Sequence, residues 1–182
     1  MEIQETSIQG VYIVKPTVFN DNRGFFFEAY NQSKYTCKNI RSEFIQDNIS
    51  CSQKGAIRGL HYQLNPYSQA KLVQVIRGAV LDVVVDIRKN SPTYGKHFSI
   101  ELTEENKLQL FVPRGMAHGF SVLANETLFF YKCDNIYNKA SERGIKWNDP
   151  ELGIDWKVPA DKAIISAKDD LLLNFKEAEK NF

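Results

Sequence analysis

Alternation of apolar and polar residues over short stretches is the feature that most constrains the fold of this chain. Within residues 79–88, one face would carry Leu81, Val83, Val85 and Ile87, and the other Val80, Asp82, Val84 and Asp86. A repeat of two residues predicts a half-buried β-strand. Residues 96–102 alternate in the same way, with Phe98, Ile100 and Leu102 predicted to point inward. Both stretches therefore indicate β-structure.

Other strand-like stretches follow one another along the chain, separated by turns rich in Gly, Pro and Asn. They cover residues 11–15, 24–30, 44–50, 56–63, 71–77, 107–112, 117–124 and 126–134. Helical patterns are confined to short stretches near residues 31–38 and after Asp161. Many short strands at this spacing predict an all-β sandwich, barrel or jelly roll with a few short peripheral helices. The length of 182 residues suits a single domain over residues 1–182.

Composition excludes several classes of function. The net charge is +1, and 43% of residues are hydrophobic, as in an ordinary globular enzyme or binding protein. Wholesale nucleic-acid or membrane binding is not expected, and an anionic ligand would need a local basic site. The N-terminal residues lack a signal-peptide pattern and no apolar run approaches a membrane span, so we expect a cytoplasmic protein.

The three cysteines, Cys37, Cys51 and Cys133, are odd in number and widely spaced. They match neither a disulfide framework nor a zinc motif. We therefore expect reduced thiols without a catalytic role.

Two of the three histidines, His61 and His118, lie close to glycines within strand-like stretches. Histidine is the side chain best suited to proton transfer near neutral pH. Because inward side chains of a small barrel meet in its interior, His61, Lys71, His118 and Tyr131 are expected to lie within reach of one another. Each also has a purely structural alternative, as a core histidine, a solvated lysine or a packed aromatic ring. His97 is expected at the surface.

The stretch from Arg58 to His61 raises a question of geometry. Strict alternation would place Arg58 and His61 on opposite faces of their strand. Gly59 between them could mark a β-bulge that turns both side chains inward.

A metal site is not expected at His61. The sequence there reads His61-Tyr62-Gln63, without the second nearby histidine of a typical metal-binding cupin. Two isolated histidines make a poor site for a divalent ion. We expect neither a metal nor another cofactor.

Several longer motifs carry a resemblance to a known family. The stretch from Pro113 to His118 reads Pro-x-Gly-x-x-His, the second signature of cupin barrels, and the chain resembles the dTDP-4-dehydrorhamnose 3,5-epimerases over essentially its whole length. The matching runs are residues 21–28, 46–48, 58–61, 71–73, 86–88, 91–95, 117–120, 131–132, 147–149 and 166–169. The resemblance implies a metal-free cupin jelly roll, a homodimer, and an isomerase acting on a nucleoside-diphosphate 4-keto-6-deoxyhexose.

The resemblance also implies roles for individual residues. His61 would be the catalytic base, paired with Asp169, while Tyr131 would be the acid and Lys71 would stabilise the sugar enolate. The implied substrate contacts, besides Lys71, are Arg23, Glu28, Gln46, Asn48, Arg58, His118, Glu142 and Lys168.

Two residues depart from the family pattern. Arg114 and Met116 replace an expected acidic or neutral residue and an expected aromatic one, and they are expected to flank His118 at the barrel mouth. The departure leaves the identity of the sugar nucleotide open. Two alternatives also stay open, an epimerase acting at one carbon only and a non-catalytic sugar-binding cupin.

Overall fold

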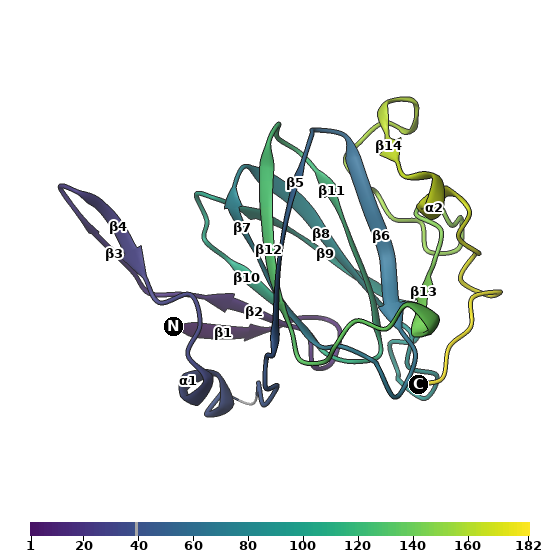
Figure 1. Cartoon of the computed structure of the whole chain (residues 1–182), viewed down its shortest axis with the longest axis horizontal. Helices are drawn as coiled ribbons and strands as arrows, with labels where there is room; N and C mark the ends of the chain where they lie inside the picture. Colours follow the sequence, from purple (N-terminus) through teal and green to yellow (C-terminus); the bar gives the residue numbers. More distant parts are fainter. Residues whose placement is uncertain (39) are drawn as a thin grey trace.

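A computed structural model describes residues 1–38 and 40–182, and its core is formed by two antiparallel sheets that face one another (Figure 1). The first sheet has the order β1 (Glu2–Glu5), β2 (Tyr12–Lys15), β10 (Gln109–Val112), β7 (Lys71–Arg77), β12 (Thr127–Cys133) and β5 (Gln46–Ser52). The second has the order β13 (Glu142–Gly144), β6 (Ala56–Gln63), β11 (Met116–Val122), β8 (Ala79–Asp86) and β9 (His97–Thr103). A short strand, β14 (Ile164–Ile165), pairs in parallel with β6.

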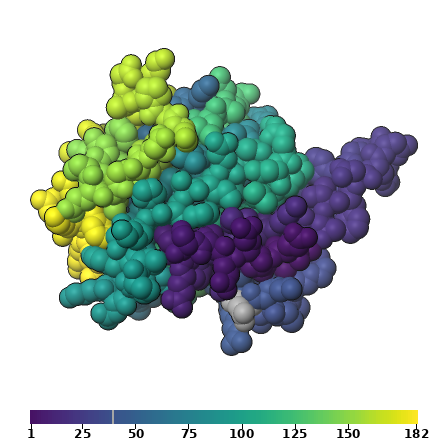
Figure 2. Space-filling view, turned by 180° about the vertical axis from the view of Figure 1, so that it is seen from behind, coloured from purple at the N-terminus to yellow at the C-terminus, as the bar shows by residue number. Residues whose placement is uncertain are grey.

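A β-hairpin stands away from these sheets. Its strands β3 (Val18–Asp21) and β4 (Gly24–Phe27) pair with each other in a two-stranded sheet, and the hairpin projects from the body in Figures 1 and 2. The helical pieces are short: α1 (Gln32–Thr36), α2 (Ala167–Asp170), and the 3₁₀ turns η1 (Lys139–Ser141) and η2 (Ala160–Lys162). No helix within the described residues is long and apolar enough to cross a membrane. The arrangement confirms the predicted all-β jelly roll with a few short helices.

The space between the two sheets is filled by alternate side chains of their strands. Val73 and Val75 of β7 and Phe129 of β12 meet Val84 of β8 and Phe120 of β11 there. The prediction for residues 96–102 is confirmed on its apolar face: Leu102 is fully buried, and Phe98 and Ile100 pack against the same cluster. The repeat of two residues thus sets which side chains enter the barrel.

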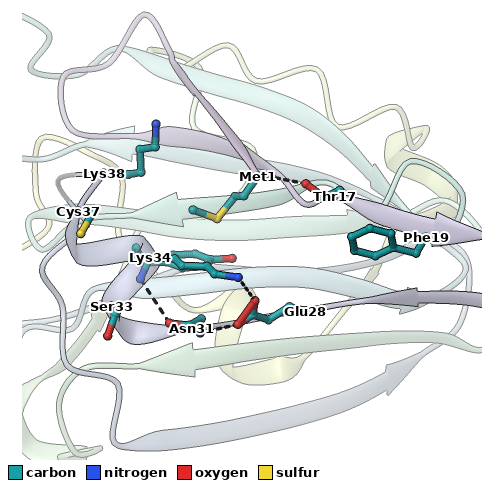
Figure 3. Close-up of a pocket in the computed structure, with 10 residues that line it drawn as sticks. Met1, Thr17, Phe19, Glu28, Asn31, Ser33, Lys34, Cys37 and Lys38 are labelled. Atoms are coloured by element: carbon teal, nitrogen blue, oxygen red, sulfur yellow. Dashed lines mark hydrogen bonds and ion pairs between the residues drawn. The ribbon is translucent and has the colours of Figure 1, made fainter.

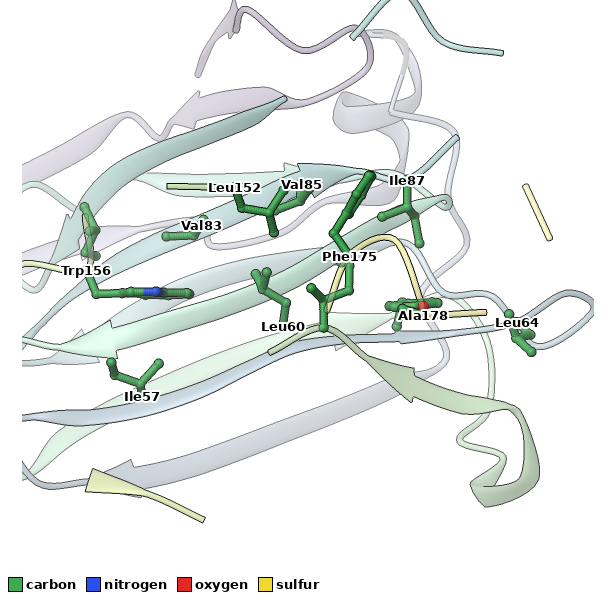
Figure 4. Close-up of a cluster of buried hydrophobic side chains, with 14 residues drawn as sticks. Ile57, Leu60, Leu64, Val83, Val85, Ile87, Leu152, Trp156, Phe175 and Ala178 are labelled. Atoms are coloured by element: carbon green, nitrogen blue, oxygen red, sulfur yellow. The ribbon is translucent and has the colours of Figure 1, made fainter. Parts of the chain in front are cut away.

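The outer face of the second sheet is also buried, which corrects the expectation of a half-buried strand at residues 79–88. Leu81, Val83 and Val85 pack under the C-terminal part of the chain, where Trp156 and Phe175 cover them (Figure 4). The prediction failed because a cover contributed by residues far away in sequence leaves no mark on the strand itself.

Strand boundaries differ from the sequence expectation by a few residues. The strand predicted at residues 24–30 ends at Phe27, and Asn31 then caps α1 by accepting a hydrogen bond from the backbone N–H of Lys34. The strand predicted at residues 44–50 runs instead from Gln46 to Ser52. Strands β1, β3, β13 and β14, each of four residues or fewer, were not predicted.

Candidate active site

A cavity of about 480 Å³ lies inside the barrel. An adjoining cavity of about 310 Å³ shares three lining residues with it, His61, Lys71 and Tyr131. His118 lines the larger cavity as well, so the structure brings together all four side chains that were expected to meet in the interior. His61 and His118 come from the second sheet, whereas Lys71 and Tyr131 come from the first. The cavity therefore has chemically active groups on both of its walls.

A β-bulge in β6 places Arg58 and His61 on the same wall. His61 pairs with His118 of β11, but Arg58 pairs with Phe120, so β6 uses one more residue than β11 over this stretch. The extra residue lies at Gly59, whose φ is +101°. A Cβ atom there would come within 2.6 Å of the carbonyl oxygen of His118, which leaves room for glycine only. The bulge suggested by the sequence is confirmed.

His61 and Asp169 form a hydrogen-bonded pair at the cavity wall. Nε2 of His61 lies 2.8 Å from Oδ1 of Asp169, and the backbone N–H of Gly59 donates to Oδ2 at 3.3 Å. Burial alone would raise the pKa of Asp169, but the hydrogen bonds from His61 and Gly59 outweigh it and hold the pKa below its usual value. Because an ionised carboxylate only accepts, Nε2 carries the proton and Nδ1 is left as the basic nitrogen of the ring.

Local structure fixes the position of Asp169. Ser166 caps the short helix α2, and its Oγ accepts a hydrogen bond from the backbone N–H of Asp169 at 3.0 Å. The side chain of Asp169 is 6% exposed, whereas that of His61 is 31% exposed and so remains accessible to a ligand.

His118 has a carboxylate partner of its own. Its Nε2 lies 2.9 Å from Oδ2 of Asp82, whose side chain is fully buried in β8. Burial raises the pKa of Asp82, an effect that His118 opposes. The alternation in residues 79–88 predicted that Asp82 lies on the polar face of a half-buried strand, so this contact was not expected. The available signal was a carboxylate flanked on both sides by apolar residues in the middle of the strand, which is rare unless the charge is paired.

Lys71 and Tyr131 lie side by side on the opposite wall. The Nζ atom of Lys71 is 5.9 Å from the centre of the Tyr131 ring. Burial lowers the pKa of the Lys71 ammonium, and nearby acidic groups partly offset this. Burial also raises the pKa of the Tyr131 hydroxyl, so the phenol keeps its proton at neutral pH. The pair offers two hydrogen-bond donors to anything held in the cavity.

Arg58 and Lys168 also line the larger cavity and give it positive charge. Arg58 Nε donates to Ser52 Oγ at 3.0 Å, which holds the guanidinium against β5. Lys168 contacts Glu142 at 2.6 Å, and the Tyr137 hydroxyl donates to the same carboxylate. Burial would raise the pKa of Glu142, but these contacts keep it below its usual value. Two of the predicted substrate residues, Lys168 and Glu142, thus contact each other directly.

Gln46 and Asn48 line the smaller cavity beside Tyr131. The Gln46 amide donates to Asn48 Oδ1 at 3.0 Å, and the Asn48 amide lies 3.8 Å from the sulfur of Cys133. All three cysteines are free, with Cys133 buried and Cys37 and Cys51 exposed.

Arg23 and Glu28 do not lie at the cavity of their own chain. Arg23 sits at the tip of the β3–β4 hairpin, is 85% exposed, and pairs with Asp21. Glu28 lies in a separate pocket beside α1, where Lys34 and Asn31 contact its carboxylate (Figure 3). The structure therefore gathers the remaining predicted substrate residues and leaves these two outside.

Arg114 and Met116 correct another expectation, because neither lines the two cavities. Arg114 pairs with Asp134 and lines a different surface pocket. Met116 is buried between the sheets. Although Met116 shares a strand with His118, it points into the packed part of the barrel, so these departures do not reshape the cavity wall.

Among the described residues, no group of three or more His, Cys, Asp or Glu side chains is arranged to hold a metal ion. The wall residues instead offer a base at His61, donors at Lys71 and Tyr131, and cations at Arg58 and Lys168. Such a set can move protons on a bound anionic ligand.

Comparison with known proteins agrees with this geometry. The sequence profile of the dTDP-4-dehydrorhamnose 3,5-epimerase family matches residues 5–177. The chain is 50% identical to the enzyme of that name from Shigella flexneri over 170 residues, which are 93% of each chain. A crystal structure of the Elizabethkingia anophelis enzyme superposes with a TM-score of 0.93 at 50% identity and covers 97% of both chains.

A further structure, from Legionella pneumophila in complex with dTDP-4-keto-L-rhamnose, gives a TM-score of 0.92 at 43% identity, covering 96% of this chain and 93% of that one. The sequence comparisons and the structural superpositions thus point to the same family. This chain belongs to the dTDP-4-dehydrorhamnose 3,5-epimerase family.

Proposed function

We propose that this protein is an isomerase that inverts carbons 3 and 5 of dTDP-4-dehydro-6-deoxyglucose to give dTDP-4-dehydrorhamnose. The observation that carries the proposal is the pairing of His61 with Asp169 on one wall of the cavity, with Lys71 and Tyr131 on the other. The family relatives are named for this reaction. The proposal treats residues 1–182 as one catalytic domain.

The reaction needs a base because both carbons lie next to the ketone at carbon 4. Removal of either proton gives an enolate, which is why these protons are weakly acidic. His61 takes the proton at Nδ1, and Asp169 stabilises the imidazolium that forms, as a carboxylate does in a catalytic triad. Neither step requires a metal or a redox cofactor.

The opposite wall completes the inversion. Lys71 donates to the developing enolate oxygen, where a preorganised donor in an enclosed site is most effective. Tyr131 keeps its proton at neutral pH, because burial raises its pKa, and can return a proton to the face opposite His61. His61 and Tyr131 belong to facing sheets, and this placement supports inversion rather than return of the proton to its original face.

Arg58 and Lys168 bind the diphosphate, His118 contacts the sugar, and Gln46, Asn48 and Glu142 contact the rest of the nucleotide sugar. Two cations on the larger cavity suit a diphosphate, and a guanidinium can bind two oxygens at once. The chain as a whole has a net charge of only +1, so the attraction for the anion is local.

Product analysis tests this assignment. Purified protein is incubated with dTDP-4-dehydro-6-deoxyglucose, the mixture is reduced with borohydride, and the sugars are identified by NMR. We expect sugars of the L-series with both centres inverted. Inversion at a single carbon would instead establish the one-carbon alternative, and unchanged sugar that remains bound would indicate a non-catalytic sugar-binding protein.

A homodimer is part of the proposal, and it gives Arg23 and Glu28 a role. Strand β5 turns polar residues into the cavity, and Ile49 on its other face is exposed. Ile45 just before β5 and Ile76 of β7 in the same sheet are exposed as well, so this sheet carries apolar surface on its outside. The hairpin carries exposed rings of its own, Phe19, Phe25 and Phe26. Two copies related by a two-fold axis could bury both surfaces and bring each hairpin to the cavity of the other copy.

Subunit complementation tests the dimer. Arg23→Ala and His61→Ala chains are co-expressed with different tags, and the heterodimer is purified. If Arg23 acts in the partner's cavity, one of the two sites is intact and activity should reach about half that of the wild type. Heterodimers as inactive as the two parents would refute exchange of the hairpins, and a monomer in light scattering would refute the dimer itself.

The proposal also retains the cytoplasmic location expected from the sequence. Cell fractionation with a tagged chain tests it, and recovery outside the cytoplasmic fraction would contradict it.

A further inference from the structure

Strand β5 presents a row of polar side chains to the barrel interior. Gln46, Asn48, Ser50 and Ser52 alternate along the strand with residues whose side chains are exposed outside. A strand facing a packed core would normally carry apolar residues at such positions. Most of these polar side chains therefore face the two cavities and not the hydrophobic core.

Three members of this row have hydrogen-bond partners within the protein. Gln46 and Asn48 bond to each other, and Ser52 Oγ accepts from Arg58 Nε. Ser50 differs, because its Oγ is enclosed yet has no hydrogen-bond partner among the described residues. The indole N–H of Trp147 is the other buried side-chain group without a partner in that part of the chain, but Trp147 does not line either cavity. An enclosed hydroxyl without a partner costs free energy, so its retention needs a reason.

The surroundings of Ser50 point to a ligand. Ser50 lies opposite Phe129 in the pairing of β5 with β12 and lines the larger cavity together with Arg58, His61 and Lys168. Phe129 stacks on Phe120 with ring centres 4.1 Å apart, and both rings line the cavity but offer no hydrogen-bond acceptor of their own. The hydroxyl therefore stands between an apolar wall and the cationic groups.

We propose that Ser50 is a substrate-binding residue whose hydroxyl turns about the Cα–Cβ bond toward the cavity and hydrogen-bonds an oxygen of the bound nucleoside-diphosphate sugar. This inference rests on the proposed function. The oxygen belongs either to the diphosphate or to a hydroxyl of the sugar, since both are compatible with a site beside Arg58 and His61. A contact made equally in the ground state and in the transition state changes substrate affinity more than turnover.

Calorimetric titration of Ser50→Ala with dTDP and with dTDP-glucose, which lacks the ketone and cannot react, tests the inference. If the oxygen is on the diphosphate, both ligands should bind about 10-fold more weakly or worse, because the acceptor is charged. If it is on the sugar, dTDP should bind normally and dTDP-glucose about 2- to 10-fold more weakly. The matched control is Ser99→Ala, which removes an exposed hydroxyl from β9 and should bind as the wild type does.

Thermal unfolding of the free variant separates binding from structure. Ser50→Ala removes a hydroxyl that has no hydrogen-bond partner among the described residues, so its Tm should equal or exceed that of the wild type. Unchanged affinity for both ligands, or a lowered Tm as the only effect, would overturn the inference while leaving the proposed function intact. A wild type that binds neither ligand would overturn both.

Discussion

Replacement of Asp169 by Asn should abolish most of the activity through the tautomer of His61. The backbone N–H of Gly59 donates to Oδ2 of Asp169 and requires an acceptor at that place. In the variant the amide oxygen takes this position, so the NH₂ group faces Nε2 of His61. Nε2 must then accept, the proton moves to Nδ1, and the nitrogen that serves as base is blocked.

The expected loss in kcat is about 10⁴-fold, the scale of the effect when a carboxylate that fixes the tautomer of a catalytic histidine is replaced by its amide. Product formation is followed by NMR, and dTDP affinity is measured in parallel and should change little. Asp170→Asn is the matched control, because Asp170 lies in the same short helix but is exposed. An Asp169→Asn enzyme with kcat within about threefold of the wild type would show that the pair does not set the tautomer.

Three further predictions concern the acid, the enolate donor and the stability of the fold. Tyr131→Phe should retain proton exchange but lose doubly inverted product, most clearly at carbon 5; wild-type product formation would make the tyrosine structural. Lys71→Met should lower kcat by about 10²-fold or more with dTDP still bound, as expected for a lost enolate donor, and normal turnover would contradict this role. Burial would raise the pKa of Asp86, but hydrogen bonds from Arg88, Ser91 and Thr93 outweigh this and lower it from 3.8 to about 2. This stabilisation, about 2 kcal/mol, is present above pH 3.8 and is lost as the pH falls toward 2. In urea unfolding, Asp86→Asn should therefore be less stable than wild type at pH 7 and approach it in acid; a constant difference across that range would contradict the linkage.

The fold was largely predictable because alternation along a strand directly records which side chains are buried. Residues 96–102 show this, since their apolar face enters the barrel as expected. Residues 79–88 show where this record is incomplete. Their pattern could not reveal that Trp156 and Phe175 would cover the second face, because that contact depends on the path of the distant C-terminal segment.

The site was predictable where a residue stood in a recognisable motif. His61, Lys71, His118 and Tyr131 meet in one cavity, and Gly59 marks the bulge that brings Arg58 to the same wall. Asp82 was missed because a carboxylate in an alternating strand usually indicates a solvated face. Tyr137, which donates to Glu142, stands in no motif that we recognised.

Arg23 and Glu28 illustrate a different limit. Their motif predicted a role in binding, but the sequence gives no sign that a projecting hairpin would carry Arg23 away from the cavity of its own chain. Whether such residues act in the same subunit or in its partner is a property of the assembly.

Solvent deuterium incorporation tests the central claim most directly. The protein is incubated in D₂O with dTDP-4-dehydro-6-deoxyglucose, and the sugar is examined by NMR. Because each inversion removes a proton and returns one from a group that exchanges with solvent, we predict deuterium at both carbon 3 and carbon 5 of the inverted product. A sugar recovered without deuterium at either carbon would contradict the account.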